Sequence, residues 1–293
     1  MPVVDLVIPG FETDKQGTGI IPVTHESVED VGAYGPDRVF VHIVLDGEQD
    51  TAIDSRLGAL AEDGHPVLRI SLPQPEAIGG EFLRWEIATA IAGALLGVNP
   101  FDEPDVTASK LITREILDQS PDGAMPDSGE PAAASDSLEV YVDDQRAWAG
   151  SLRADTARQL IGSFVELAGP GEYIGVLAFL AGTPERNELL AELRAGLRAR
   201  TGVATTAGYG PRYLHSSGQL HKGGPNTGLY LLLTSDAAVD IPIPETTDGF
   251  AVLQRAQALG DERALLERDR RVLRVNLGWY VEEGLEALVE ALT

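Results

Sequence analysis

The sequence predicts an α/β protein in which helices cover both faces of mostly parallel sheets. Short apolar runs of strand length alternate with longer segments of helical spacing, and apolar residues make up 43% of the 293 residues. Residues 119–137 are rich in proline, glycine and serine and contain no Leu, Ile, Val or aromatic residue. We therefore expect two α/β domains, residues 1–118 and 138–293, joined by this linker. Each domain is expected to be a three-layer α/β/α sandwich.

In the first domain the apolar runs predict short strands that alternate with helices. The strands are expected at 3–8, 39–45 and 67–72, with a helix at 52–61 between the last two. Residues 79–97 are apolar on nearly every helical face, which predicts a buried helix rather than an amphipathic one.

The second domain shows the same alternation more completely. Thr183 and Pro184 form a typical helix start, with Thr as the cap and Pro in the first turn. The predicted helices are 154–168, 185–200, 249–268 and 279–292, and the predicted strands are 138–142, 173–179, 203–206, 229–234 and 272–275. A largely parallel sheet of this kind binds ligands at the carboxyl ends of its strands.

The connection at 207–228 is the segment richest in chemical groups. It combines glycines with histidines, hydroxyl groups and cations, and it follows the predicted strand at 203–206. Loops of this composition present backbone amides and side chains to a small polar ligand. We expect it to line a cleft, although a long surface loop without a ligand is the alternative reading.

Charge and composition exclude several classes of partner. The formal charge of −24 and the pI of about 4.4 repel nucleic acid and anionic membrane surfaces. The chain has no cysteine, no apolar run long enough for a membrane span and no signal-peptide pattern at its first residues. We expect a cytoplasmic protein that binds neither nucleic acid nor membranes.

Two segments carry motifs of a known enzyme family. The first comprises Trp85-Glu86, Gly93, Asn99-Pro100-Phe101-Asp102-Glu103-Pro104, Val106 and Lys110. The second is Tyr213-Leu214-His215-Ser216-Ser217-Gly218-Gln219. The first resembles the C-terminal helix and turn of glucose-6-phosphate isomerases, and the second is similar to a Leu-His-Ser-x-Gly-Gln segment of their bacterial members. The run through Gly228, and the segment 255–261, look like the isomerase half of bifunctional transaldolase/glucose-6-phosphate isomerase proteins.

The resemblance implies sugar-isomerase (SIS) domains, a sugar phosphate substrate and a homodimer, with no metal or organic cofactor. By motif position it implies that Lys110 and His215 are catalytic residues that serve ring opening. We expect the polar side chains around His215 to bind the substrate. These are Arg212, Ser216, Ser217, Gln219, Lys222, Asn226 and Thr227.

The base that moves the proton in this family is a Glu followed by a Lys-x-Gly-x-Gly-Ile pattern. Here the pattern is matched by residues 15–20, and an ungapped alignment puts Phe11 at the position of the base. A gap of one residue puts Glu12 there. Glu12 is therefore the candidate base, and loss of the base is the alternative.

The chain also departs from the family in its phosphate-binding loop. The Ser/Thr-rich loop of the family's preceding sugar-isomerase domain is not found in this sequence. We expect the C-terminal portion or a shortened relative of such an enzyme, with an upstream transaldolase or sugar-isomerase domain as its partner. On its own the chain is expected to isomerise glucose 6-phosphate weakly or not at all. The alternatives are a non-catalytic sugar-phosphate-binding module and a dimerisation module.

Overall fold

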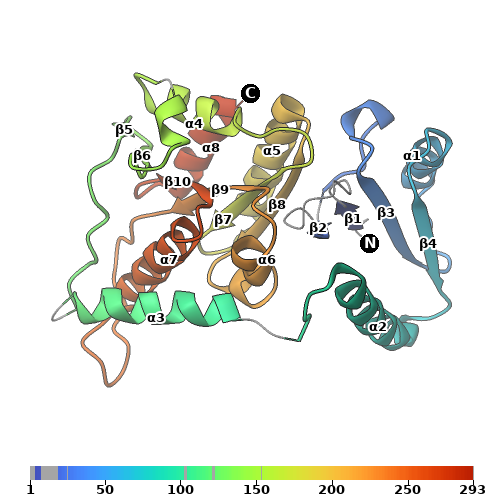
Figure 1. Ribbon diagram of the computed structural model, residues 1–293, viewed down its shortest axis with the longest axis horizontal. Coiled ribbons are helices and arrows are strands. Elements are labelled where there is room, and N and C mark those ends of the chain that lie inside the picture. Colours follow the sequence, from blue (N-terminus) through green and yellow to red (C-terminus); the bar gives the residue numbers. More distant parts are fainter. Residues whose placement is uncertain are drawn as a thin grey trace. The chain divides into compact units, whose positions relative to one another are not determined.

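The computed structural model shows a mixed α/β chain that divides into two compact units, Met1–Glu103 and Pro104–Thr293 (Figure 1). It describes residues 4–7, 19–24, 26–101, 104–120, 123–152 and 154–292. The predicted α/β class is confirmed. No helix within these ranges combines the length and the apolar character that a membrane span requires.

The first unit contains a four-stranded sheet in the order β2-β1-β3-β4. β3 and β4 are parallel, whereas β1 is antiparallel to both β2 and β3. This sheet is less parallel than predicted, because a parallel pair needs a long crossover and only β3 and β4 are joined through a described α-helix, α1. The strands are β1 Val4–Val7, β2 Ile21–Val23, β3 Arg38–Leu45 and β4 Val67–Leu72.

Two α-helices complete the described part of the first unit, and the second of them corrects a prediction. Helix α1 (Thr51–Glu62) buries Leu57 and Leu60 against Phe40 of β3. Helix α2 (Ile78–Leu96) forms where the sequence predicted it, but the structure does not bury it. Leu83, Ile87 and Leu95 are 58%, 52% and 83% exposed, because no described element of this unit covers that face. Short 3₁₀ turns lie at Val31–Ala33 and Pro75–Ala77.

The second unit contains a six-stranded sheet in the order β5-β6-β10-β9-β7-β8. The four strands β10, β9, β7 and β8 are parallel, and β6 joins β10 in the antiparallel sense. β5 extends the antiparallel edge from within the predicted linker. The strands are β5 Ala133–Ala134, β6 Glu139–Tyr141, β7 Tyr173–Ala178, β8 Ala204–Tyr209, β9 Gly228–Thr234 and β10 Arg271–Asn276.

Helices form two groups on opposite faces of this sheet (Figure 1). Alternation along β7 directs Ile174 and Val176 into the core with α4, α5 and α8, whereas the ring of Tyr173 meets α6 on the other face. Helices α3, α6 and α7 pack together on that second face. The helices are α3 Pro104–Asp118, α4 Ala157–Val165, α5 Pro184–Thr201, α6 Gly218–Gly223, α7 Phe250–Leu266 and α8 Val281–Leu292.

The helix ends follow from local chemistry. The Thr183 hydroxyl accepts a hydrogen bond from the amide of Arg186, and Pro184 fills the first turn of α5, as the sequence predicts. Helix α5 ends at Gly202, which adopts a left-handed conformation with φ of 72°. Each of the four helices predicted for this unit is confirmed with small shifts of its ends.

Helix α3 belongs to the second unit, although the sequence grouped its residues with the first domain. It lies along α7 and contacts α6. The contact with α7 is close because Gly260 has no side chain. A Cβ built there would lie 2.5 Å from Thr113 Oγ1 and 3.0 Å from the Thr113 amide nitrogen.

Candidate functional site

The candidate site is built by the connection between β8 and β9. The sequence predicted a loop there, and the structure shows that it contains a 3₁₀ turn, η5 (Arg212–His215), followed by α6. Because β8 and β9 both run parallel to β7, this connection leaves the carboxyl edge of the sheet and returns to the amino edge. Residues at its two ends are therefore separated by a strand length, roughly 20 Å.

At the carboxyl edge, Arg212 lines a pocket that is open to solvent. The pocket lies beyond the ends of β7 and β8, and its lining includes Leu180, Asn187 and Tyr209. The Tyr209 hydroxyl donates to Asn187 Oδ1 at 2.7 Å, and the Arg212 guanidinium lies 5.8 Å from the Tyr209 ring centre. This arrangement offers a cation, a hydroxyl and an amide to a small polar ligand.

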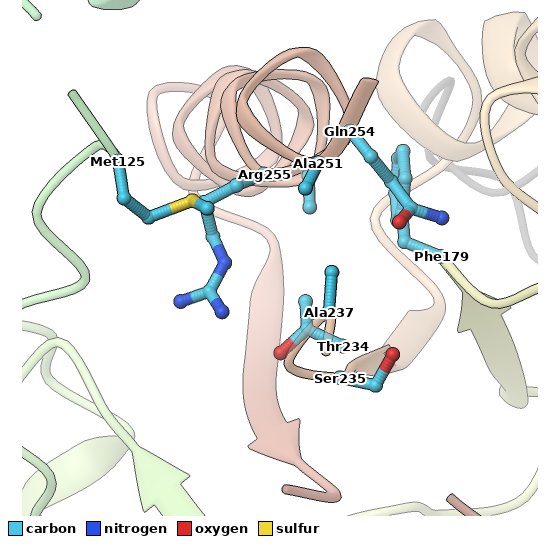
Figure 2. Close-up of a pocket in the computed structure, with 9 residues that line it drawn as sticks. Met125, Phe179, Thr234, Ser235, Ala237, Ala251, Gln254 and Arg255 are labelled. Carbon is cyan, nitrogen blue, oxygen red and sulfur yellow. The ribbon is translucent and has the colours of Figure 1, made fainter. Parts of the chain in front are cut away.

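A second pocket lies where the strand order reverses, between β7 and β9 (Figure 2). Crevices at such reversals are the usual ligand sites of parallel sheets. Residues from β9, from the start and middle of α7 and from the predicted linker surround it in Figure 2. The lining is Met125, Phe179, Thr234, Ser235, Ala237, Ala251, Gln254, Arg255 and Ala258.

The cation of this second pocket, Arg255, is already paired with other side chains of the protein. Arg255 pairs with Asp236 at 2.8 Å and also donates to the Ser128 hydroxyl. The carbonyl of Ser128 accepts a hydrogen bond of 2.6 Å from Arg274. Two arginines thus hydrogen-bond to the linker beside the pocket, and the charge of Arg255 is already neutralised by Asp236. The open pocket at Arg212 is the better candidate for an anionic ligand.

Three segments resemble glucose-6-phosphate isomerases, namely 85–110, 213–228 and 255–261, and residues of each take part in contacts at one buried carboxylate. Asp261 of α7 has no exposed side-chain surface, and its Oδ1 lies 2.5 Å from Lys222 Nζ of α6. Ser109 of α3 donates to Oδ1 at 3.4 Å, and the hydroxyl of Tyr213 in η5 donates to Oδ2. We call these four residues the Asp261 cluster. It connects the helix that carries Lys110 to the turn that carries His215.

The electrostatics of this region follow from burial. Burial, reinforced by the Asp261 carboxylate, raises the pKa of Tyr213 well above its usual value. Burial lowers the pKa of His221 to about 3, with smaller contributions from Lys222 and Arg270. His221 lies among the rings of Tyr173, Tyr213 and Tyr230 and is uncharged at neutral pH. It cannot supply a positive charge to a substrate.

The predicted catalytic residues lie on the surface of the second unit, except for the base. Lys110 of α3 and His215 of η5 both have exposed side chains, and their neighbours Ser109 and Tyr213 share the carboxylate of Asp261. Glu12 and its alternative Phe11 lie outside the described residues. The structure therefore brings together the elements of two of the three predicted catalytic residues.

The predicted substrate-binding residues separate into three groups. Arg212 and Ser216 are exposed in and beside η5, and Ser217 and Gln219 are half-buried at the start of α6. Lys222 is corrected to an internal residue, because its ammonium group is fully buried against Asp261. The last two residues, Asn226 and Thr227, precede β9 at the amino edge of the sheet.

One small sugar cannot bridge these two edges of the sheet. The Asn226 side chain donates to the Asp269 carbonyl at 3.2 Å, and the Thr227 carbonyl accepts from the amide of Tyr173 at 3.0 Å. Their contacts in this structure are with the protein. Among the predicted site residues, the exposed side chains of Arg212, His215 and Ser216 lie towards the carboxyl edge, and the Ser216 hydroxyl there donates to the Tyr213 carbonyl at 3.1 Å.

Sequence reasoning did not single out Asp261, Tyr213 or Ser109 as site residues. A signal was present, since Asp261 closes the segment 255–261 and follows Gly260. A glycine inside a helical segment can indicate close packing of that helix, whereas the acidic residue beside it is ordinarily exposed. The identity of the partner of Asp261 depends on contacts between distant parts of the chain.

Comparisons with known proteins give a partial relationship. The chain is 36% identical over 96 residues to glucose-6-phosphate isomerase of Rubrobacter xylanophilus, which covers 32% of this chain and 21% of that protein. It is 28% identical over 147 residues to glucose-6-phosphate isomerase of Leptospira interrogans, covering 38% and 33%. The chain thus spans about a fifth to a third of the length of these curated relatives.

No protein-family model matches the chain. Among solved structures, a hypothetical protein from Thermus thermophilus aligns with a TM-score of 0.36 and 15% identity, covering 85% of this chain and 56% of that one.

Proposed function

We propose that this chain supplies part of the active site of a glucose-6-phosphate isomerase, which interconverts glucose 6-phosphate and fructose 6-phosphate. One observation carries the proposal: the three segments that resemble this family converge on Asp261. A resemblance carried by segments that are distant in sequence is stronger evidence when those segments also contact the same residue. The partial sequence relationship to curated isomerases supports the same proposal.

The isomerisation requires only a few acid and base groups from the protein. Isomerisation moves a proton between C2 and C1 of the open-chain sugar through an enediol, so one base must reach both carbons. Ring opening needs a group that takes the proton of the C1 hydroxyl and one that protonates the ring oxygen. In this proposal Glu12 is the base at the carbons, and His215 and Lys110 serve ring opening. The Lys110 cation also stabilises the negative charge that develops on oxygen.

Electrostatics favour the face around η5 for the phosphate. The chain as a whole carries a formal charge of −24 and repels a sugar phosphate, so binding requires local cations. Arg212 is exposed at the open pocket, and Lys110 is exposed on α3, whose Ser109 shares the carboxylate of Asp261 with Tyr213 of η5. A guanidinium group is well suited to phosphate because it can donate two parallel hydrogen bonds.

Histidine NMR tests the proposal directly, because the chain has only five histidines. We expect glucose 6-phosphate to shift the ring signals of His215, with weak affinity on the order of 1 mM, whereas glucose alone leaves them unchanged. Lys110→Ala and Arg212→Ala should reduce the shift. Arg114→Ala is the matched control, since Arg114 is exposed one turn further along α3. An unshifted His215 at saturating glucose 6-phosphate would overturn the proposal.

The same experiment separates the alternatives. Binding that never leads to turnover with any upstream domain would identify a non-catalytic sugar-phosphate-binding module. A stable dimer that does not bind glucose 6-phosphate would identify a dimerisation module. We also propose a homodimer and an upstream sugar-isomerase domain as partners, and light scattering of the purified chain measures the first of these.

A further inference from the structure

We infer that Asp261 is a positioning residue that fixes the Lys110 helix and the His215 turn relative to each other. The inference rests on the proposed function for its consequence in catalysis. Its structural part stands on the contacts alone. No part of Asp261 reaches the surface, so it acts through its neighbours and does not touch a substrate.

The geometry gives Asp261 one hydrogen-bond partner on each side. On one side, Ser109 Oγ lies 3.4 Å from Oδ1, and Ser109 directly precedes Lys110. On the other, the Tyr213 hydroxyl donates to Oδ2, and Tyr213 stands two residues before His215. Both partners are buried, so neither can exchange its bond to Asp261 for a bond to bulk water. A buried carboxylate with directional donors fixes the separation of the segments that carry them.

Lys222 explains how a carboxylate persists in this core. A buried charge is very unfavourable unless it is paired and hydrogen-bonded. Lys222 Nζ lies 2.5 Å from Asp261 Oδ1, and both side chains have no exposed surface. The ammonium group makes no hydrogen bond of good geometry to a described residue, so it acts as a charge partner. The carbonyl of Lys222 is itself held by Arg270 at 2.6 Å. Lys222 thus serves the site as the internal counter-ion of Asp261.

Packing around Tyr213 fixes the position of η5 relative to Asp261. The Tyr213 ring packs edge-on against Phe179 at 5.9 Å, and a Cβ at Gly208 would lie 2.8 Å from Tyr213 Cβ. The Tyr213 side chain is therefore confined by Phe179, which directly follows β7, and by Gly208 of β8, while its hydroxyl is held by α7. Loss of the hydroxyl removes the link to Asp261 and leaves the packing of the ring unchanged.

Tyr213→Phe is accordingly the decisive variant. It preserves the Asp261–Lys222 pair, so it should fold even if Asp261→Asn does not, since that change leaves Lys222 buried without its charge partner. Tyr173→Phe is the matched control. Tyr173 is also a buried tyrosine of this sheet face, and its hydroxyl bonds to Tyr230. Glu262→Gln is the control for Asp261→Asn, because Glu262 is the next residue of α7 and pairs instead with Arg274.

Spin labels measure the positioning without any need for activity. The chain has no cysteine, so cysteines introduced at Lys110 and Ser216 can be labelled selectively. We expect one narrow distance distribution between the labels with Tyr213 and Asp261 intact, and in the Tyr173→Phe and Glu262→Gln controls. Tyr213→Phe and Asp261→Asn should broaden it. A distribution that stays narrow in Tyr213→Phe would overturn the inference.

Ligand binding and steady-state kinetics, both measured on unlabelled protein, give the functional readout. Misplacement of a reacting group by about 1 Å can lower a rate about 100-fold. In the assembled enzyme we therefore expect Tyr213→Phe to lower kcat about 10- to 100-fold, with a smaller change in KM, while Tyr173→Phe changes neither. An intact His215 shift and unchanged kcat in Tyr213→Phe would refute the positioning role. Failure of the unmodified chain to bind glucose 6-phosphate would instead refute the proposed function and leave the spin-label result standing.

Discussion

Two neighbouring histidines of the site region have opposite environments. His215 is exposed on η5, whereas His221 is 2% exposed and surrounded by tyrosine rings. The Nδ1 atom of His221 has no hydrogen-bond partner among the described residues. Burial, together with Lys222 and Arg270, lowers the pKa of His221 to about 3, so His221 stays uncharged near neutral pH.

The lowered pKa of His221 predicts a loss of stability in acid. The unfolded chain protonates this histidine near pH 6.5, but the folded chain does so only near pH 3. Between these values the unfolded state binds more protons, so the free energy of unfolding falls as the pH falls. The contribution is about 1.4 kcal/mol per pH unit within that window. Above pH 6.5 it vanishes.

His221→Gln removes this titration and tests it. Urea unfolding of both proteins at pH 7, 6, 5 and 4 gives the difference in free energy of unfolding at each pH. We expect the wild-type protein to lose more stability than the variant between pH 6 and pH 4, because carboxylate titration is common to both. A difference that stays constant over this range would show that His221 is not held neutral.

At the scale of elements, the contact between α3 and α7 supports the site. Gly260 lets the two helices approach, and an added Cβ would lie 2.5 Å from Thr113 Oγ1 and 3.1 Å from Thr113 Cα. Gly260→Ala should therefore destabilise the fold by about 1–3 kcal/mol through overpacking. This loss outweighs the gain in helix propensity of up to about 1 kcal/mol. Denaturant unfolding measures the sum.

Gly58→Ala supplies the control for that prediction. Gly58 also lies within a helix, α1, but nothing lies within 4 Å of a Cβ built there. Only the propensity term remains, so this variant should be stabilised by about 0.5–1 kcal/mol. If Gly260→Ala also stabilised the protein, the close approach of α3 and α7 would be refuted.

Sequence patterns predicted the positions of helices and strands better than they predicted what those elements pack against. The strands of the second sheet are confirmed, because apolar runs of strand length next to a capped helix have few other solutions. The exposure of α2 was not predicted. Its apolar residues indicate that burial would be favourable, but the sequence pattern does not show which other element, if any, covers them. Lys222 was misread for a related reason. A cation in a glycine-rich connection indicates a ligand until the distant Asp261 is known to pair with it.

At the scale of the whole molecule, we predict that the chain alone holds only part of an active site. The chain spans about a fifth to a third of the length of the isomerases it resembles. The Ser/Thr-rich phosphate loop is not found in the sequence, and the candidate base Glu12 is displaced by one position from the family pattern. Loss of a general base alone lowers a rate by about 10²–10⁴. Poor positioning of the substrate multiplies that loss.

We therefore predict little or no isomerisation of glucose 6-phosphate by the chain alone, and recovery when a sugar-isomerase domain with the phosphate loop is added. A coupled assay that follows fructose 6-phosphate formation measures both. Glu12→Gln in the reconstituted pair should lower turnover about 10²–10⁴-fold, because an amide cannot accept the proton from C2. Full activity of the chain alone would refute the need for a partner. An active pair that is insensitive to Glu12→Gln would show that another residue moves the proton.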